Sequence, residues 1–175
     1  MGRGLWSTRN IVEDCLILSI SNLKRDGFIK NDMLYEYPMN GYTVWKNSYG
    51  EKLSTIGFSI RTEDNRGNIK LDYAQTDRQG NVTEKIAYDI GLTTTVCNFG
   101  GRRWWFACAC HSNNVYCGRR VGKLYKPKNS KYFACRHCYN LTYKSCRENH
   151  MYDKFGLFSN LTPSRCNRIL KGLKL

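Results

Sequence analysis

Residues 100–145 decide the fold, and they read GGRRWWFACACHSNNVYCGRRVGKLYKPKNSKYFACRHCYNLTYKS. This stretch holds five of the nine cysteines of the 175-residue chain. Cys135 and Cys138 form a C-x-x-C pair, a spacing that lets two thiolates converge on one metal ion. A structural zinc site needs four ligands in a tetrahedron, so a second pair has to come from upstream in the same stretch.

The second pair is predicted from two β-like runs that flank a loop. Cys108 ends the run that begins at Arg102, and Cys117 precedes Gly118, behind which the second run extends to Tyr125. A glycine permits the tight backbone turn that a metal knuckle requires. Eight residues separate the two cysteines, whereas zinc ligands usually stand two to four residues apart. We therefore expect a zinc-ribbon hairpin whose loop carries an insertion.

Cys110 and His111 are alternative first ligands, because either would also fit a second pair with Cys117. Among other roles for the cysteines, disulfides need an oxidising compartment, and a redox C-x-x-C needs a βαβ context. An iron–sulfur cluster could use the same thiolates, but paired hairpins favour one structural Zn²⁺. The other cysteines have no partner at metal spacing and are expected to be buried or half-buried: Cys15, Cys97, Cys146 and Cys166.

The net charge of +14 is confined to one part of the chain. Residues 1–100 carry twelve basic and twelve acidic side chains, whereas residues 101–175 carry sixteen basic and two acidic ones. We place a boundary at Gly100-Gly101 for this reason. Three parts are expected, namely a helix plus antiparallel β-rich domain at 1–99, a zinc ribbon at 100–145 and a basic helical tail at 146–175.

Basic side chains surround the predicted metal ligands, and a surface of this kind neutralises phosphates. Aromatic side chains alternate with them, and most are expected to pack, with Trp104 or Trp105 sealing the ribbon against the β-rich part. The predicted nucleic-acid-binding residues are Arg102, Arg103, Arg119, Arg120, Lys123, Lys126, Lys128, Lys131, Arg136 and Lys144.

The first hundred residues predict a helix followed by a β-meander. Val12, Leu16, Ile20 and Leu23 would share one helical face, so a helix is expected over 11–25, or two short helices if Ser19 and Ser21 split the stretch. Alternating apolar residues at 56–60, 69–73 and 82–90, separated by turns at 65–68 and 78–81, predict three antiparallel strands. Segments 43–46 and 93–97 are expected to add two more. Weaker helical patterns follow at 146–155 and 163–170, so the predicted fold class is α+β.

The motifs GGRRWWF, CGRRVGKLY and YFACRHCYNLTY resemble the signature of an uncharacterised family of small bacterial zinc-ribbon proteins, often from mobile regions. The resemblance covers about residues 100–153. It implies Cys108, Cys117, Cys135 and Cys138 as the metal ligands, although Ala109 stands where the family has proline. It implies no biochemical activity.

Composition and motifs narrow the function classes. No apolar run approaches the roughly 20 residues of a membrane helix, and no export signal is visible, so we expect a cytoplasmic protein. A zinc deaminase would carry H-x-E and P-C-x-x-C, which are absent. The set Glu148, His150 and Asp153 fits a nuclease only loosely, so no enzyme is predicted.

Two functions remain after these exclusions. The first is a nucleic-acid-binding accessory protein, for DNA or RNA. The second is a protein-interaction module that regulates or inhibits a nucleoprotein machine, such as a phage-defence (CRISPR-type) effector. The neutral β-rich part could hold a protein partner or a second copy in a homodimer.

Overall fold

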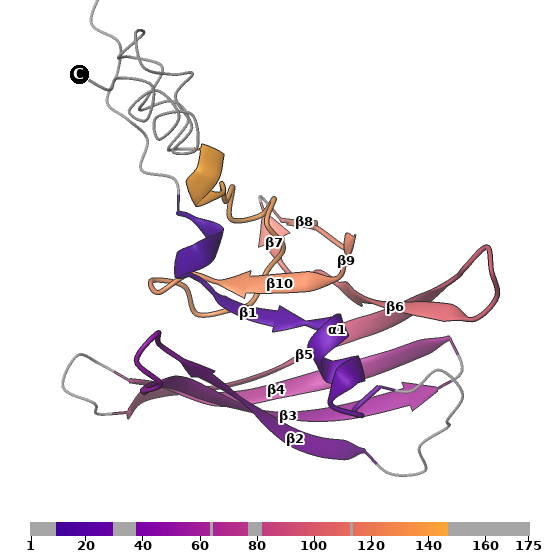
Figure 1. The fold of residues 1–175 in the computed structure, drawn as a ribbon, viewed down its shortest axis with the longest axis horizontal. Coiled ribbons are helices and arrows are strands. Elements are labelled where there is room, and N and C mark those ends of the chain that lie inside the picture. The colour runs from indigo at the N-terminus through magenta and orange to yellow at the C-terminus, as the bar shows by residue number, and fades with distance from the viewer. Residues whose placement is uncertain (1–9, 30–37, 64, 77–81, 113, 147–175) are drawn as a thin grey trace, which may run out of the picture.

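The protein is mostly β, as a computed structural model of residues 10–29, 38–63, 65–76, 82–112 and 114–146 shows. Six antiparallel strands form one sheet in the order β2-β3-β4-β5-β6-β9, and the sheet curves into a half-barrel (Figure 1). Its strands are β2 Met39–Lys46, β3 Lys52–Glu63, β4 Arg66–Thr76, β5 Val82–Val96, β6 Arg102–Ala107 and β9 Arg120–Val121.

The alternating pattern of the first hundred residues builds this sheet. Successive side chains of a strand point to opposite faces, so Ile60, Ile69 and Ile90 lie together on the inner face, with no exposed surface. The predicted meander is therefore confirmed. Segment 93–97 is not a separate strand, because β5 continues to Val96 and pairs there with β6.

One residue of the predicted inner face is displaced. The register of β4 against β5 shifts between Gln75 and Thr76, so that Thr76 pairs with Val82 while Gln75 pairs with Glu84. Such a bulge turns the following side chains relative to the sheet. Val82 is 58% exposed as a result. The predicted turn at 78–81 lies outside the described residues.

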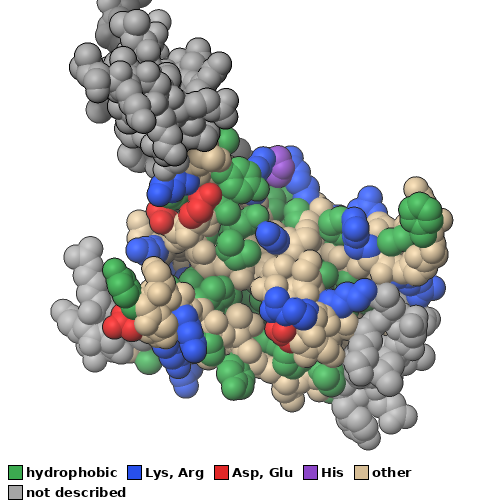
Figure 2. Space-filling model, in the orientation of Figure 1, with side chains coloured by type: hydrophobic (Ala, Val, Ile, Leu, Met, Phe, Trp, Pro, Cys, Tyr) green, Lys and Arg blue, Asp and Glu red, His purple; other side chains and the backbone are tan. Residues whose placement is uncertain are grey.

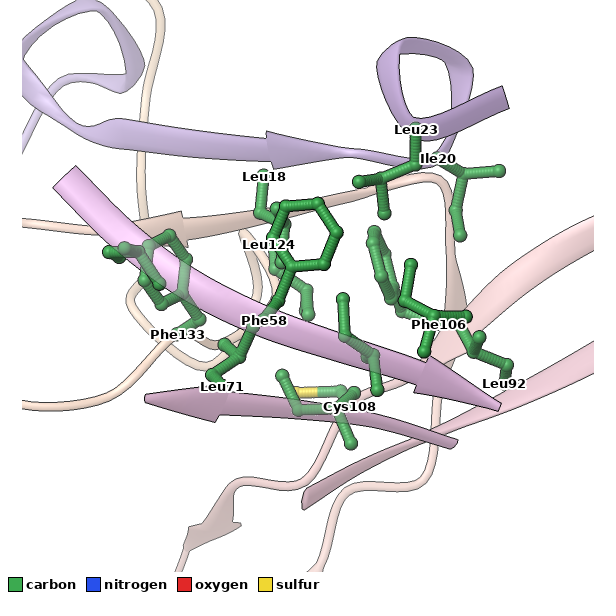
Figure 3. Close-up of a cluster of buried hydrophobic side chains, with 14 of the residues drawn as sticks. Leu18, Ile20, Leu23, Phe58, Leu71, Leu92, Phe106, Cys108, Leu124 and Phe133 are labelled. Carbon is green, nitrogen blue, oxygen red and sulfur yellow. The ribbon is translucent and has the colours of Figure 1, made fainter. Parts of the chain in front are cut away.

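A two-stranded ribbon covers the inner face of the half-barrel. It consists of β1 (Leu16–Ser19) and β10 (Lys123–Lys126), which pair antiparallel with Leu18 opposite Leu124. Figure 3 shows these two leucines above Phe58 in the buried cluster.

The single helix predicted over 11–25 is wrong for residues 11–19. A 3₁₀ turn at Val12–Asp14 (η1) comes first, β1 follows, and the α-helix α1 covers only Ile20–Arg25. Helical periodicity is a weak signal that tertiary pairing overrides, and here β10 supplies that pairing. The helix does end as predicted, because Gly27 adopts φ of 84° and donates its N–H to the Lys24 carbonyl.

One hydrophobic cluster joins the inner face of the sheet, the covering ribbon and two of the cysteines. The predicted boundary at Gly100-Gly101 falls in the turn between β5 and β6, neighbouring strands of the same sheet. The division into separate domains stays a prediction. No helix within the described ranges is long and apolar enough to cross a membrane. The helices predicted at 146–155 and 163–170 lie outside these ranges, except for Cys146.

Replacement of Leu124 by alanine tests how much the covering ribbon stabilises the sheet. Leu124 is fully buried, so we expect Leu124→Ala to lower the free energy of unfolding by about 2–5 kcal/mol. Leu53→Ala is the matched control, because Leu53 lies on β3 and is 61% exposed. Urea unfolding of both variants measures the difference. Equal, small losses would show that β10 packs only loosely on the sheet.

Candidate metal centre

The first cysteine pair lies at the mouth of the hairpin between β6 and β9. The Cys108 N–H donates to the Arg119 carbonyl at 3.0 Å, and the Gly118 N–H donates to the Cys108 carbonyl at 3.1 Å. Gly118 has φ of 57°, in the left-handed region that glycine adopts most easily. These bonds carry the chain back so that Cys117 faces Cys108 across the turn.

The long spacing between these cysteines is accounted for by a small hairpin. Its strands are β7 (His111–Ser112) and β8 (Val115–Tyr116), and Asn114 stands between them with φ of 62°. The Cys117 N–H closes the hairpin by donating to the Cys110 carbonyl at 2.9 Å. The insertion is therefore looped out, and the knuckle around the cysteines is kept.

The second pair stands in a compact turn. The Leu141 N–H donates to the Arg136 carbonyl at 3.0 Å, and Asn140 adopts φ of 46°. The Cys135 N–H points at the sulfur of the other knuckle, with 3.2 Å between this nitrogen and the Cys108 Sγ. Backbone N–H groups directed at sulfur stabilise the thiolate form.

The four sulfur atoms converge on one point. The Sγ atoms of Cys108, Cys117, Cys135 and Cys138 all lie within 4.8 Å of one another. The Cys108–Cys138 and Cys117–Cys135 pairs are 3.9 Å apart, and the Cys135–Cys138 pair is 3.5 Å apart. Four sulfurs bound tetrahedrally at about 2.3 Å would lie about 3.8 Å apart. The donor set therefore fits one metal ion.

The alternative ligands lie outside this cluster. Cys110 directs its thiol to the His111 carbonyl at 3.7 Å, and the His111 ring lies against Tyr116 at 5.2 Å between centroids. The cluster is thus the set that the family resemblance implied. All described cysteines are free thiols. Cys15 is buried and Cys97 is half-buried as predicted, whereas Cys146 is exposed, five residues beyond Leu141, the last buried residue of the described ranges.

The surroundings of Cys108, Cys117 and Cys138 shift the pKa values of these thiols when no cation is bound. Burial raises the pKa of Cys108 to about 11, and it also raises the pKa of Cys138, where the Cys117 and Cys135 thiols add to the effect. Burial opposes ionisation of Cys117 too, but the Arg119 backbone N–H and the neighbouring thiols lower its pKa below the usual value. A metal ion would bind these sulfurs as thiolates and release their protons.

Two tyrosines of the meander hold the segment that leads into the second knuckle. The Tyr88 hydroxyl accepts the Phe133 N–H at 2.7 Å, and the Tyr73 hydroxyl donates to the Lys131 carbonyl. Burial raises the pKa of Tyr88 to about 12, so this phenol stays protonated at neutral pH. These positioning residues were not predicted from the sequence, although tyrosine at inward positions of two strands was a signal for a buried hydroxyl that needs a partner.

The ten predicted nucleic-acid-binding residues differ in their exposure and in their contacts inside the protein. Arg119, Arg120, Lys123 and Lys128 are exposed. Several of the others have specific contacts.

Two of these contacts involve lysines at one end of the region. Lys131 forms a 2.6 Å ion pair with Glu84 of β5. Lys126 is half-buried, with its ammonium 5.8 Å from the centre of the Tyr73 ring, and burial lowers its pKa. Phosphate binding at these two lysines would therefore compete with contacts inside the protein.

Two arginines lie over aromatic rings. The Arg103 guanidinium is 5.5 Å from the Trp105 ring centre, and the Arg136 guanidinium is 5.2 Å from that of Tyr143. Trp104 is only 4% exposed and belongs to the shared core. Of the two tryptophans, it is therefore Trp104 that packs the predicted zinc-ribbon segment against the meander.

Comparisons with protein-family models, with curated proteins and with solved structures found no match for the chain. The family resemblance therefore stays a prediction. The four-cysteine cluster is the part of it that the structure supports.

Substitution of one ligand tests the metal centre. Cys135→Ser removes a buried sulfur, so we expect loss of bound metal from one equivalent towards none and unfolding of the surrounding turns, because ligand binding and folding are coupled in such sites. Metal analysis and circular dichroism of the same sample measure both. Cys110→Ser is the matched control and should keep its metal. Full metal content in Cys135→Ser would contradict the assignment.

Proposed function

We propose that the protein is a non-catalytic accessory protein, held together by one structural zinc ion, that binds nucleic acid through its basic surface. A four-thiolate set suits zinc, and it leaves no coordination position open for water, which favours a structural role over catalysis. When bound, zinc would supply four bonds that tie the two knuckles to each other.

The distribution of charge carries the nucleic-acid part of this proposal. No Asp or Glu occurs between residues 101 and 146, although ten Lys and Arg do. Eight of these ten cations are exposed, and Arg119 and Arg120 follow directly after the first knuckle. A surface with one sign of charge and no interspersed acids attracts a polyanion and steers its approach. Glu148, His150 and Asp153, the loose nuclease candidate, lie outside the described residues.

A second candidate function is protein interaction, including control of a nucleoprotein machine. The observation that favours it is the edge of the sheet, because β2 pairs only with β3 among the strands that the structure describes. Tyr42, on this strand, is 72% exposed, and Leu53, on β3 near the Trp45–Lys46 end of the pair, is 61% exposed. Open edge strands with apolar side chains often pair with another chain. A complex that survives nuclease treatment and is lost in Tyr42→Lys would favour this function over the first.

Salt dependence tests the nucleic-acid proposal. Each phosphate contact releases counterions, so four contacts to duplex DNA should weaken binding about a hundredfold between roughly 50 and 200 mM salt. Fluorescence anisotropy with labelled DNA and RNA measures this. The double variant Arg119→Gln/Arg120→Gln should bind more weakly than the wild type.

Lys70→Gln/Lys85→Gln is the matched control, since both lysines are exposed on the meander, away from the cysteine region. We expect it to bind like the wild type. An affinity that hardly changes with salt, or equal losses in the two double variants, would rule the proposal out.

A further inference from the structure

A groove runs beside β6 on the side that faces α1. β6 pairs with β5 over residues 102–106, but it pairs with β9 only at Phe106 and Ala107. The side of β6 away from β5 is therefore not covered by another described strand at residues 102–105. α1 and Gly122 line the groove opposite this edge, and its volume is about 490 Å³. Figure 1 shows α1 next to β6.

The charged side chains that line the groove are all cationic. They are Lys24 from α1 and Arg102 and Arg103 from β6, and no Asp or Glu of the described residues lines the groove. All three are exposed. Figure 2 shows Lys and Arg side chains gathered over this part of the molecule. Three cations on two sides of a hollow complement a ligand with several negative charges, which is the pattern of a phosphate chain.

The groove also offers aromatic surface and an unused hydrogen-bond donor. Trp105 is half-buried there, and its indole N–H is fixed by the Thr95 hydroxyl at 2.8 Å. Trp104 also lines the groove, and its buried indole N–H has no acceptor among the described residues. An indole nitrogen can only donate.

We propose that this groove binds the phosphates of a single nucleic-acid strand, with Lys24 and Arg103 on opposite sides of the backbone. The inference rests on the proposed function and gives it a location and a type of substrate. A hollow of about 490 Å³ can take part of a strand's backbone between its two cationic sides. Proteins that bind single strands combine such a cationic groove with aromatic side chains on which bases stack.

Lys24 is the new element in this site. Its position in the sequence places it in the electrically neutral first hundred residues, and only the packing of α1 against β6 brings it to the basic strand. Its neighbour Arg25 points elsewhere, since it pairs with Asp26 at 3.2 Å and does not line the groove. Of these two neighbouring cations on α1, Lys24 therefore belongs to the groove and Arg25 does not.

The test compares these neighbours in the full-length protein. Anisotropy is measured with a labelled single strand of about 16 nucleotides and with the duplex of the same sequence, over a range of salt. In Lys24→Gln/Arg103→Gln we expect single-strand binding to weaken on the order of tenfold. The slope of log K against log [salt] should become less steep by about 1.4, because each lost contact to a single strand removes about 0.7.

Arg25→Gln is the control and should bind both probes within about twofold of the wild type, as single charges outside the site contribute little. Metal content and thermal unfolding show whether each variant is folded. If the wild type binds the single strand and the double variant binds it equally well, the groove is wrong and the proposed function stands. If the wild type binds neither probe, the proposed function fails and the groove fails with it. A loss confined to the duplex would overturn the assignment to a single strand.

Discussion

The rest of the structure depends on the convergence of four sulfur atoms from two separate turns. Cys108 and Cys135 are fully buried in the same hydrophobic cluster as the sheet, so their sulfurs cannot be hydrated. Burial disfavours thiolates unless a cation or backbone N–H groups compensate. The fold supplies such N–H groups, among them that of Cys135 to the Cys108 sulfur, and it brings the four sulfurs close enough together to share one cation. The centre is therefore part of the core as well as a link between the turns.

This link brings together segments that lie far apart in the chain. β1 pairs with β10 across about a hundred residues, and the Val12 N–H reaches the Thr142 carbonyl at 3.0 Å, just beyond the second knuckle. Closing loops of this length costs conformational entropy before any contact repays it. A metal ion that fixes both knuckles would remove much of the freedom of residues 108–138. It would also present β10 in the conformation that β1 needs.

Sequence patterns correctly predicted those parts of the fold that depend on residues close together in the chain. Alternation identified β3 and β4, and the C-x-x-C pair identified the second knuckle, because each depends on neighbouring residues. The segment at 16–19 was mistaken for a helix because its partner, residues 123–126, is distant in the sequence. The roles of Tyr73 and Tyr88 were missed for the same reason: a buried hydroxyl gives no indication of which backbone group it will reach.

The charge of the molecule illustrates this limit most directly. Counted along the sequence, the first hundred residues are neutral in sum, and the excess of cations lies in residues 101–175. In space, acids from the first part reach one end of the basic region, where Glu84 pairs with Lys131 at 2.6 Å and the Glu13 carboxylate accepts the Lys144 backbone N–H at 3.1 Å. At the other end, α1 adds Lys24 to the cations of β6. The positive field is therefore reduced beside Lys131 and strengthened beside β6. A polyanion would be drawn to the end of the molecule where the first hundred residues contribute a cation instead of an acid.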